Sequence, residues 1–338
     1  MKIGIDCRYL GMSGIGRFLE GIIMMLPKEH SYVYWGNENK IKGYNLKGEI
    51  LACDTSPFSP KGLFNAPKKL NQCDVFFTPN FIIPYGIKVP VYSTIHDVIF
   101  LDDKSTTTGF MDAKIKKHLL KRCSKKSKFI FTVSEFSKSR ILHYFPKCQK
   151  KIGVVYTGLS NKLMEYQPKA LEKRNQIIFV GNLKKNKNII ELLKAFEIVK
   201  TKDEAMELLL VGSNDHKTKD EALSKYLTMP GVRFTGRITD EELFDLISES
   251  RFLIQPSLYE GFGLPPLEAL YLGTRPILNV IEVFKEIYYS FDVIFYEGVE
   301  DLANKILTSS YQNVKYSSQH EFQFVKVVEK ILNRIEDR

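Results

Sequence analysis

The sequence lacks the features of a disulfide scaffold, a membrane span or a zinc site. Its 338 residues include only five cysteines, an odd number, and no two of them form a C-x-x-C pair. This pattern favours free thiols in a reducing cytoplasm. No run of about 18 apolar residues is present, so we expect no membrane-spanning helix. The first residues, M-K-I-G-I-D-C-R-Y-L, have no long apolar core before a cleavage site, so we expect no secretory signal.

Acidic residues are scarce in the first half of the chain. Residues 1–151 hold 25 of the 49 Lys and Arg residues but only 12 of the 39 Asp and Glu residues, a net charge of +13, against −3 for the remainder. A basic half suits an anionic lipid, a nucleic acid or an anionic substrate. Neither a zinc-finger pattern nor an aromatic ribonucleoprotein motif is present, so we expect no nucleic-acid partner.

Short β-like runs alternate with helical or loop segments along the whole chain. They lie at 2–7, 32–35, 75–78, 89–95, 129–133, 176–183, 208–212, 232–236, 251–255 and 276–278. This alternation predicts an α/β fold with parallel sheets and helices on both faces. We expect a first domain over 1–160, a polar linker over 161–175, a second domain over 176–316 and a final apolar-periodic helix within 317–338.

One stretch, Pro256 to Arg275, carries the most specific signal: P-S-L-Y-E-G-F-G-L-P-P-L-E-A-L-Y-L-G-T-R. It follows an apolar run typical of a buried strand. Gly261 and Gly263 predict a loop whose backbone can approach a ligand, and Pro265 and Pro266 suit the first turn of a helix. A strand, a glycine loop and a helix start together present N–H groups to an anion.

Two carboxylates, Glu260 and Glu268, bracket this loop. Because an anion would bind the N–H groups, the carboxylates would accept hydrogen bonds from hydroxyls, and the pattern favours a sugar diphosphate. The alternative is that Glu268 only complements the helix dipole and the glycines only form a turn. The two glutamates and the wording E-G-F-G-L-P-P-L-E-A-L resemble the signature of the retaining glycosyltransferases of family 4.

The resemblance covers nearly the whole chain, in six segments in the family order. It implies two Rossmann-like domains facing one another across a cleft, the GT-B arrangement, with the last helix packing back toward the first domain. It implies that Glu268 holds ribose hydroxyls and that the backbone around Phe262 holds the diphosphate. The donor-binding residues it implies are Gly16, Gly181, Asn182, Lys187, Arg237, Ile238, Glu260, Gly261, Phe262, Gly263, Leu264 and Glu268.

A basic loop, Lys184 to Asn188, follows the run at 176–183 and precedes a helical pattern. A cation near a helix start could neutralise a departing diphosphate, whereas a solvated lysine run is the alternative. The segment resembles the family's F-V-G-x-L-x-x-R-K-N wording, in which Lys187 matches the lysine. Asn186 stands where an arginine is common, so Lys184 or Lys185 would have to supply that contact.

Near the start of the chain, Gly14 and Gly16 give half of a dinucleotide fingerprint. Leu19 stands where the third glycine belongs, so the signal for NAD is weak and a tight turn is the alternative. The G-I-G-R-F wording resembles a family 4 loop that lines the cleft, which implies a place near the donor for Gly16 and near the acceptor for Arg17.

His96 and Asp97 follow the expected strand at 89–95, where parallel sheets carry their ligands. A structural histidine is the alternative reading. The H-D-V-I-F-L wording resembles a family 4 segment whose histidine lies against the donor sugar, and it implies that Asp97 orients the imidazole or contacts the acceptor. His96, Glu260 and Lys187 are therefore the expected catalytic residues.

Residues 112–128 carry eight basic residues and one acid. Ile115 and Leu119 would share one helical face, and Lys114, Lys117, Lys121 and Lys125 would form another. The segment is either a solvated helix face or a surface that docks on an anionic bilayer.

The resemblance implies a retaining hexosyltransferase that uses a nucleoside diphosphate sugar, and the H-D-V-I wording, which is frequent in mannosyl- and rhamnosyl-transferring relatives, favours mannose or rhamnose. We expect a saccharide or polyprenyl-linked saccharide acceptor in surface polysaccharide (lipopolysaccharide) assembly, and a cytoplasmic protein peripheral to the inner face of the membrane. No D-x-D segment is present, so we expect no metal and no cofactor. An NAD-linked dehydrogenase, a nucleotide-sugar epimerase and a non-catalytic nucleotide-sugar binding protein are the alternatives.

Overall fold

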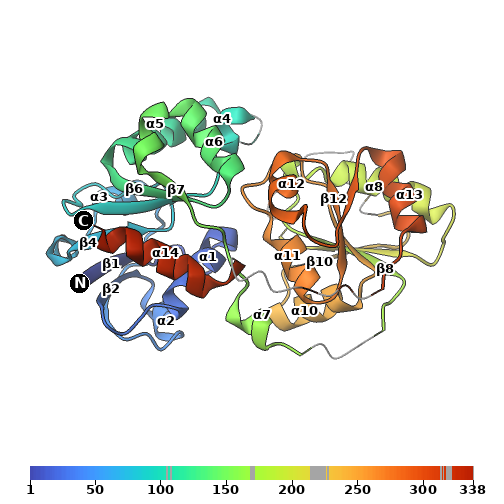
Figure 1. The fold of residues 1–338 in the computed structure, drawn as a ribbon, viewed down its shortest axis with the longest axis horizontal. Helices are drawn as coiled ribbons and strands as arrows, with labels where there is room; N and C mark the ends of the chain where they lie inside the picture. The colour runs from blue at the N-terminus through green and yellow to red at the C-terminus, as the bar shows by residue number, and fades with distance from the viewer. Residues whose placement is uncertain are drawn as a thin grey trace. The chain divides into compact units, whose positions relative to one another are not determined.

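The structure, a computed structural model, describes residues 1–337 except 104–105, 107–108, 168–171, 214–225, 227, 313, 315 and 317–321. The chain forms two compact units, Met1–Ser160 with Gln319–Arg338, and Asn161–Ser318. Each unit has a parallel β-sheet with helices packed against it (Figure 1). The α/β class expected from the alternating pattern is therefore confirmed.

The first unit contains a seven-stranded sheet in the order β3-β2-β1-β4-β5-β6-β7. Its strands are β1 (Lys2–Asp6), β2 (Ser31–Gly36), β3 (Glu49–Ala52), β4 (Val75–Thr78), β5 (Val91–Ile95), β6 (Ser127–Thr132) and β7 (Ile152–Val154). The helical elements are α1 (Ser13–Met24), α2 (Glu38–Lys42), α3 (Pro60–Phe64), η1 (Lys68–Gln72), α4 (Ile99–Asp102), α5 (Phe110–Lys126), α6 (Glu135–Tyr144), η3 (Pro146–Lys151) and α14 (Phe324–Glu336). The strand order reverses between β1 and β4, and such a reversal is where parallel α/β sheets bind ligands.

The second unit contains a six-stranded parallel sheet in the order β10-β9-β8-β11-β12-β13. Its strands are β8 (Gln176–Val180), β9 (Glu207–Val211), β10 (Val232–Gly236), β11 (Phe252–Gln255), β12 (Arg275–Asn279) and β13 (Ile294–Tyr296). The helical elements are α7 (Asn161–Glu165), η4 (Lys185–Lys187), α8 (Ile189–Lys200), α10 (Asp240–Glu249), α11 (Leu264–Tyr271), α12 (Glu282–Tyr288) and α13 (Val299–Thr308). Here the order reverses between β8 and β11.

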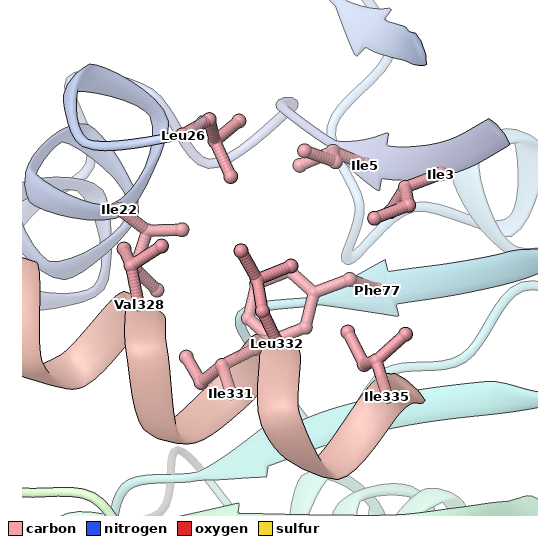
Figure 2. A pocket seen from close by; sticks show the side chains of 9 residues that line it. All are labelled: Ile3, Ile5, Ile22, Leu26, Phe77, Val328, Ile331, Leu332 and Ile335. Carbon is pink, nitrogen blue, oxygen red and sulfur yellow. The ribbon is translucent and has the colours of Figure 1, made fainter. Parts of the chain in front are cut away.

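The last helix, α14, packs on the first unit (Figure 2). Its apolar face lies against the end of α1 and against β1 and β4, through Ile3, Ile5, Ile22, Leu26, Phe77, Val328, Ile331, Leu332 and Ile335. These side chains leave a void of about 10 Å³, room for about one water molecule, with no polar side chain to bind it. Gly21 allows α1 to approach this closely, because a Cβ atom there would lie 2.2 Å from the Phe324 ring.

The segment expected to be a linker, 161–175, lies in the second unit where it is described. Its first residues form α7, and Leu163 is fully buried. Lys173 Nζ donates to the carbonyl of Ser248 and to Thr274 Oγ1, both at 2.7 Å. Burial lowers the pKa of Lys173 to about 8. The described part of this segment is therefore packed structure, while 168–171 lie outside the described residues.

All five cysteines are free thiols, and four of them are buried. No helix in the described part of the chain combines the length and the apolar character needed to cross a bilayer. Across the same ranges, no group of three or more His, Cys, Asp or Glu side chains is arranged to hold a metal ion.

Candidate functional site

The candidate residues of the second unit gather where its strand order reverses. Loops 181–188 and 256–263 follow β8 and β11, which are neighbours in the sheet and lead to connections running in opposite directions. The N–H of Leu258 donates to the carbonyl of Asn186 at 2.8 Å, and Asn186 Nδ2 donates to the carbonyl of Tyr259 at 3.2 Å. Asn186, which stands where the resemblance expects an arginine, therefore joins the two loops.

The same two loops bring Lys187 and Glu260 together across 73 positions of sequence. Lys187 Nζ and Glu260 Oε1 form an ion pair whose side chains are 17% and 12% exposed. The sequence analysis assigned these residues to different parts of one donor. In the structure, each is a partner of the other.

Two buried residues that the sequence analysis missed also hold Glu260. Ser257 Oγ donates to Glu260 Oε1 at 2.7 Å, and Gln255 Nε2 lies 3.3 Å from the same atom. Gln255 Nε2 also donates to Ser257 Oγ at 3.0 Å, and both side chains are fully buried. The available signal was a polar residue, Gln255, ending an otherwise apolar strand. Glu260 thus belongs to a preorganised polar network.

The start of α11 has the geometry expected from its glycines and prolines. Gly263 adopts a φ of +84°, and a Cβ atom there would lie 2.5 Å from the Phe284 ring. Pro265 and Pro266 occupy the first turn of the helix. Because proline has no N–H group, backbone donation to an anion in this first turn must come mainly from the residues before Pro265. That places the expected donors in the loop that also carries Glu260.

Glu268 lies on α11 with only 3% of its surface exposed. Nearby Tyr288 is fully buried, and its hydroxyl donates to the carbonyl of Gly263. Burial raises the pKa of Tyr288 well above its usual range, and the charges of Glu260 and Glu268 raise this pKa further. Both carboxylates therefore lie near one tyrosine that the sequence analysis did not single out.

The remaining expected donor residues of this unit follow β8 and β10. A Cβ atom on Gly212, after β9, would lie 1.9 Å from the carbonyl oxygen of Gly181, so the ends of β8 and β9 approach closely. Asn182 Oδ1 is buried and has no hydrogen-bond partner among the described residues. Arg237 is exposed and Ile238 is half-buried. All four expected positions lie at the carboxyl edge of the sheet, where ligands of such folds bind.

His96 follows β5 in the first unit and is held by the loop after β4. Its Nε2 lies 2.9 Å from the carbonyl oxygen of Pro79, which can only accept, so Nε2 carries the proton and Nδ1 is an acceptor. The ring packs edge-on against Phe18 with 5.0 Å between centroids. Burial lowers the pKa of His96 to about 4, against which the Pro79 contact acts weakly. His96 is therefore neutral near pH 7.

The other expected residues of the first unit have visible structural roles. A Cβ atom on Gly16 would lie 2.8 Å from the carbonyl oxygen of Tyr9, so glycine lets α1 approach the loop that precedes it. Asp97 Oδ1 accepts from the N–H of Ile99 at 3.1 Å at the start of α4. Arg17 is half-buried on α1. Within this unit, α1 connects to His96 through Phe18.

Comparison with known proteins finds a match to a family model within the second unit. Residues 163–316 match the family described as Glycosyl transferases group 1. The chain is 27% identical over 230 residues to O-antigen chain mannosyltransferase B of Escherichia coli, covering 63% of this chain and 58% of that protein. It is 30% identical over 217 residues to O-antigen chain mannosyltransferase RfbU of Salmonella typhimurium, covering 61% and 60%. The chain therefore matches about three fifths of the length of each relative.

A solved structure, that of Anabaena Alr3699/HepE in complex with UDP and glucose, shares the fold of the whole chain. The TM-score is 0.76 at 14% identity, and the match covers 100% of both chains. The protein therefore has the two-domain α/β architecture of that structure, the GT-B fold, and residues 163–316 of its second unit match the model of the glycosyl transferases group 1 family.

Proposed function

We propose that the protein is a retaining glycosyltransferase of family 4 that moves a hexose from a nucleoside diphosphate sugar to an acceptor hydroxyl. The observation that carries the proposal is the meeting of Lys187, Glu260 and the start of α11 at the strand-order reversal of the second sheet. A cation, carboxylates and backbone donors at one place suit an anionic diphosphate flanked by hydroxyl-rich rings. The family match over 163–316 supports the same activity.

In this proposal the second unit binds the donor. Glu268 accepts hydrogen bonds from the ribose hydroxyls, and the N–H groups of Phe262, Gly263 and Leu264 hold the diphosphate with Lys187. Glu260 accepts from hydroxyls of the transferred sugar. The other proposed donor-binding residues of this unit are Gly181, Asn182, Arg237, Ile238 and Gly261, and Gly16 of the first unit is proposed to join them.

The chemical step follows from where charge develops. The acceptor oxygen attacks the anomeric carbon on the face that the diphosphate leaves, and the acceptor proton passes to a diphosphate oxygen. Negative charge builds on the leaving group, so Lys187 and the backbone donors lower the barrier, each by up to roughly 3 kcal/mol. Because the sequence lacks a D-x-D segment, we propose that this reaction uses no divalent metal.

The first unit supplies the sugar and acceptor contacts of this proposal. His96 is neutral near pH 7, and its Nδ1 is an acceptor. It is therefore suited to accept a hydrogen bond from a sugar hydroxyl and not to act as a general acid. Arg17 and Asp97 bind the acceptor.

The transferred sugar is proposed to be mannose, since two relatives are O-antigen chain mannosyltransferases. The corresponding acceptor is a saccharide carried on a polyprenyl lipid, used in surface polysaccharide assembly. Such an acceptor requires the enzyme to work at the inner face of the cell membrane.

Helix α5 offers a surface for that membrane. Lys114, Lys117, Lys121 and Lys125 are exposed on its outer face, and the helix's acid, Asp112, pairs with Lys116. Ile115, one helical turn before buried Leu119, is 52% exposed, and Met111 is 66% exposed. Lysines beside exposed apolar side chains suit an anionic bilayer, at about 1 kcal/mol per basic residue. Replacing the four lysines with glutamine should abolish sedimentation with phosphatidylglycerol vesicles and leave turnover of a water-soluble acceptor unchanged.

The decisive test of the enzyme is a panel of nucleoside diphosphate sugars assayed by thermal stabilisation and then for transfer. A donor at 100 times its Kd should add about 2.7 kcal/mol of stability. With a saccharide acceptor, the product should retain the anomeric configuration of the donor. Turnover without an acceptor would indicate an epimerase instead, and binding without any transfer would indicate a non-catalytic binding protein.

A further inference from the structure

The Glu260 carboxylate is shared among several donors at one oxygen. Lys187 Nζ, Ser257 Oγ and Gln255 Nε2 all converge on Oε1. Ser257 and Gln255 are fully buried, and the carbonyl of Ser257 accepts from Asn279 Nδ2 at 3.2 Å, so these two neighbours are fixed in place. Lys187 differs from them because its long side chain is partly exposed and makes its contact through a single ammonium group.

We infer that donor binding exchanges the partner of Lys187: the diphosphate takes the ammonium group, and Glu260 is released to a hydroxyl of the sugar. This inference rests on the proposed function, in which both groups contact one donor. The two contacts are coupled, because the ammonium group that the diphosphate needs is bound to the carboxylate that the sugar needs. The ion pair thus couples recognition of the diphosphate to recognition of the sugar.

The neighbours of Lys187 support its role as the exchanging cation. Asn186 is tied by its side chain to the carbonyl of Tyr259, so it joins loops and carries no charge. Lys184 and Lys185 are exposed, whereas Lys187 is mostly buried against Glu260. Ser257 and Gln255 keep two hydrogen bonds on the carboxylate after the lysine leaves, so the released charge is not left without donors.

The exchange makes an unusual prediction for a ligand that has the diphosphate but no sugar. Such a ligand must break the ion pair between Lys187 and Glu260, but it has no hydroxyl group of a transferred sugar to donate to the Glu260 carboxylate. Removing the charge of Glu260 should therefore strengthen the binding of a nucleoside diphosphate, although Glu260 belongs to the binding site. An intact nucleotide sugar should gain nothing, because it also loses the contact between its hydroxyl and the carboxylate.

The experiment is a calorimetric titration of UDP, GDP and ADP into the full chain. Glu260→Gln should lower the Kd of the preferred nucleoside diphosphate about tenfold. Lys187→Met should raise that Kd, and adding Glu260→Gln to Lys187→Met should produce no tightening, because no ion pair remains to be broken. Glu207→Gln removes the same charge at the exposed start of β9, at the opposite end of the strands, and should change nothing.

A Kd that is unchanged or raised in Glu260→Gln, with clear binding to the unaltered chain, would overturn the exchange and leave the proposed function standing. An equal tightening in the Lys187→Met background would also overturn it, because the effect would then be general electrostatics. If the unaltered chain binds none of the three nucleotides and turns over no nucleotide sugar, the proposed function and the exchange are both overturned.

Discussion

Each sheet places an ion pair at the point where its strand order reverses, and the two pairs are built differently. In the first unit, Arg8 Nε and Nη2 donate to the two carboxylate oxygens of Asp6 at 2.8 and 2.7 Å. Arg8 Nη1 donates to the carbonyl of Gly62 at 2.7 Å, and the guanidinium lies 3.7 Å from the Trp35 ring centroid. In the second unit, one ammonium group meets one carboxylate oxygen.

The difference shows which ion pair has a structural role and which can exchange its partners for a ligand. The side chains of Arg8 and Asp6 are 1% and 0% exposed, and a planar guanidinium with three fixed acceptors has no other stable arrangement. Lys187 and Glu260 are 17% and 12% exposed, so water and ligands can reach them. The first pair therefore stabilises its unit, whereas the second is available for binding.

The largest expected effect is on the stability of the first unit. Arg8→Met leaves the Asp6 carboxylate buried without its main partner, which should cost about 3–5 kcal/mol. Trp35, the only tryptophan of the chain, lies under Arg8, so its fluorescence during urea unfolding reports on this unit. Arg8→Met combined with Asp6→Asn should recover part of the loss. A midpoint that does not change would show that the pair is not structural.

The second effect is on turnover. Lys187→Met should lower kcat/KM by roughly 100-fold, about 3 kcal/mol of transition-state stabilisation, because one donor to the leaving diphosphate is lost. The unfolding midpoint reported by Trp35 should stay constant, since Lys187 lies in the other unit. A shifted Trp35 midpoint with unchanged turnover would reverse the assignment of the two pairs.

The third effect is a pH dependence in the first unit. The folded pKa of His96 is lowered to about 4, so the unfolded chain binds more protons between about pH 6.5 and 4, and stability falls as the pH falls through that window. The loss should reach about 2 kcal/mol at pH 5. His96→Gln should remove this slope in Trp35-monitored unfolding. Parallel pH profiles for both proteins would contradict the lowered pKa of His96.

The smallest expected effect is on donor binding, and it distinguishes Ser257, a fixed neighbour of Glu260, from Lys187, the exchangeable one. Ser257→Ala removes one hydrogen bond to the carboxylate and should cost about 1–1.5 kcal/mol of donor binding, a rise in KM of about five- to twelvefold. Its effect on kcat should be smaller than that of Lys187→Met, because Ser257 holds Glu260 and does not contact the leaving group. An unchanged KM would show that Glu260 is positioned without Ser257.

Much of the fold followed from local patterns. The expected strand at 232–236 matches β10, and the helix pattern over 189–200 matches α8. The edge strands β3, β7 and β13 were not expected. They are short and only partly buried, so neither alternation nor a continuous apolar run marks them.

The sequence predicted which residues belong to the candidate site, but not which of them contact one another. Lys187 and Glu260 each stood out from a motif, yet their pairing depends on β8 and β11 being neighbours, which no local spacing encodes. Gln255 and Ser257 escaped notice because a polar residue at the end of an apolar strand does not reveal its partners, which only the folded loop brings together. Ile115 faces outward because the rotation of α5 is set by packing elsewhere on the helix, including Leu120 and Cys123.

The chain leaves the first unit at Ser160, builds the second unit without interruption, and then returns with α14 to cover Ile3, Ile5 and Phe77. During synthesis, the first half therefore emerges from the ribosome with this part of its core uncovered until the last helix is made. The second unit, being continuous, can fold in the interval. The first unit can therefore complete this part of its core only after α14 has left the ribosome, whereas the second unit needs no segment made after residue 318.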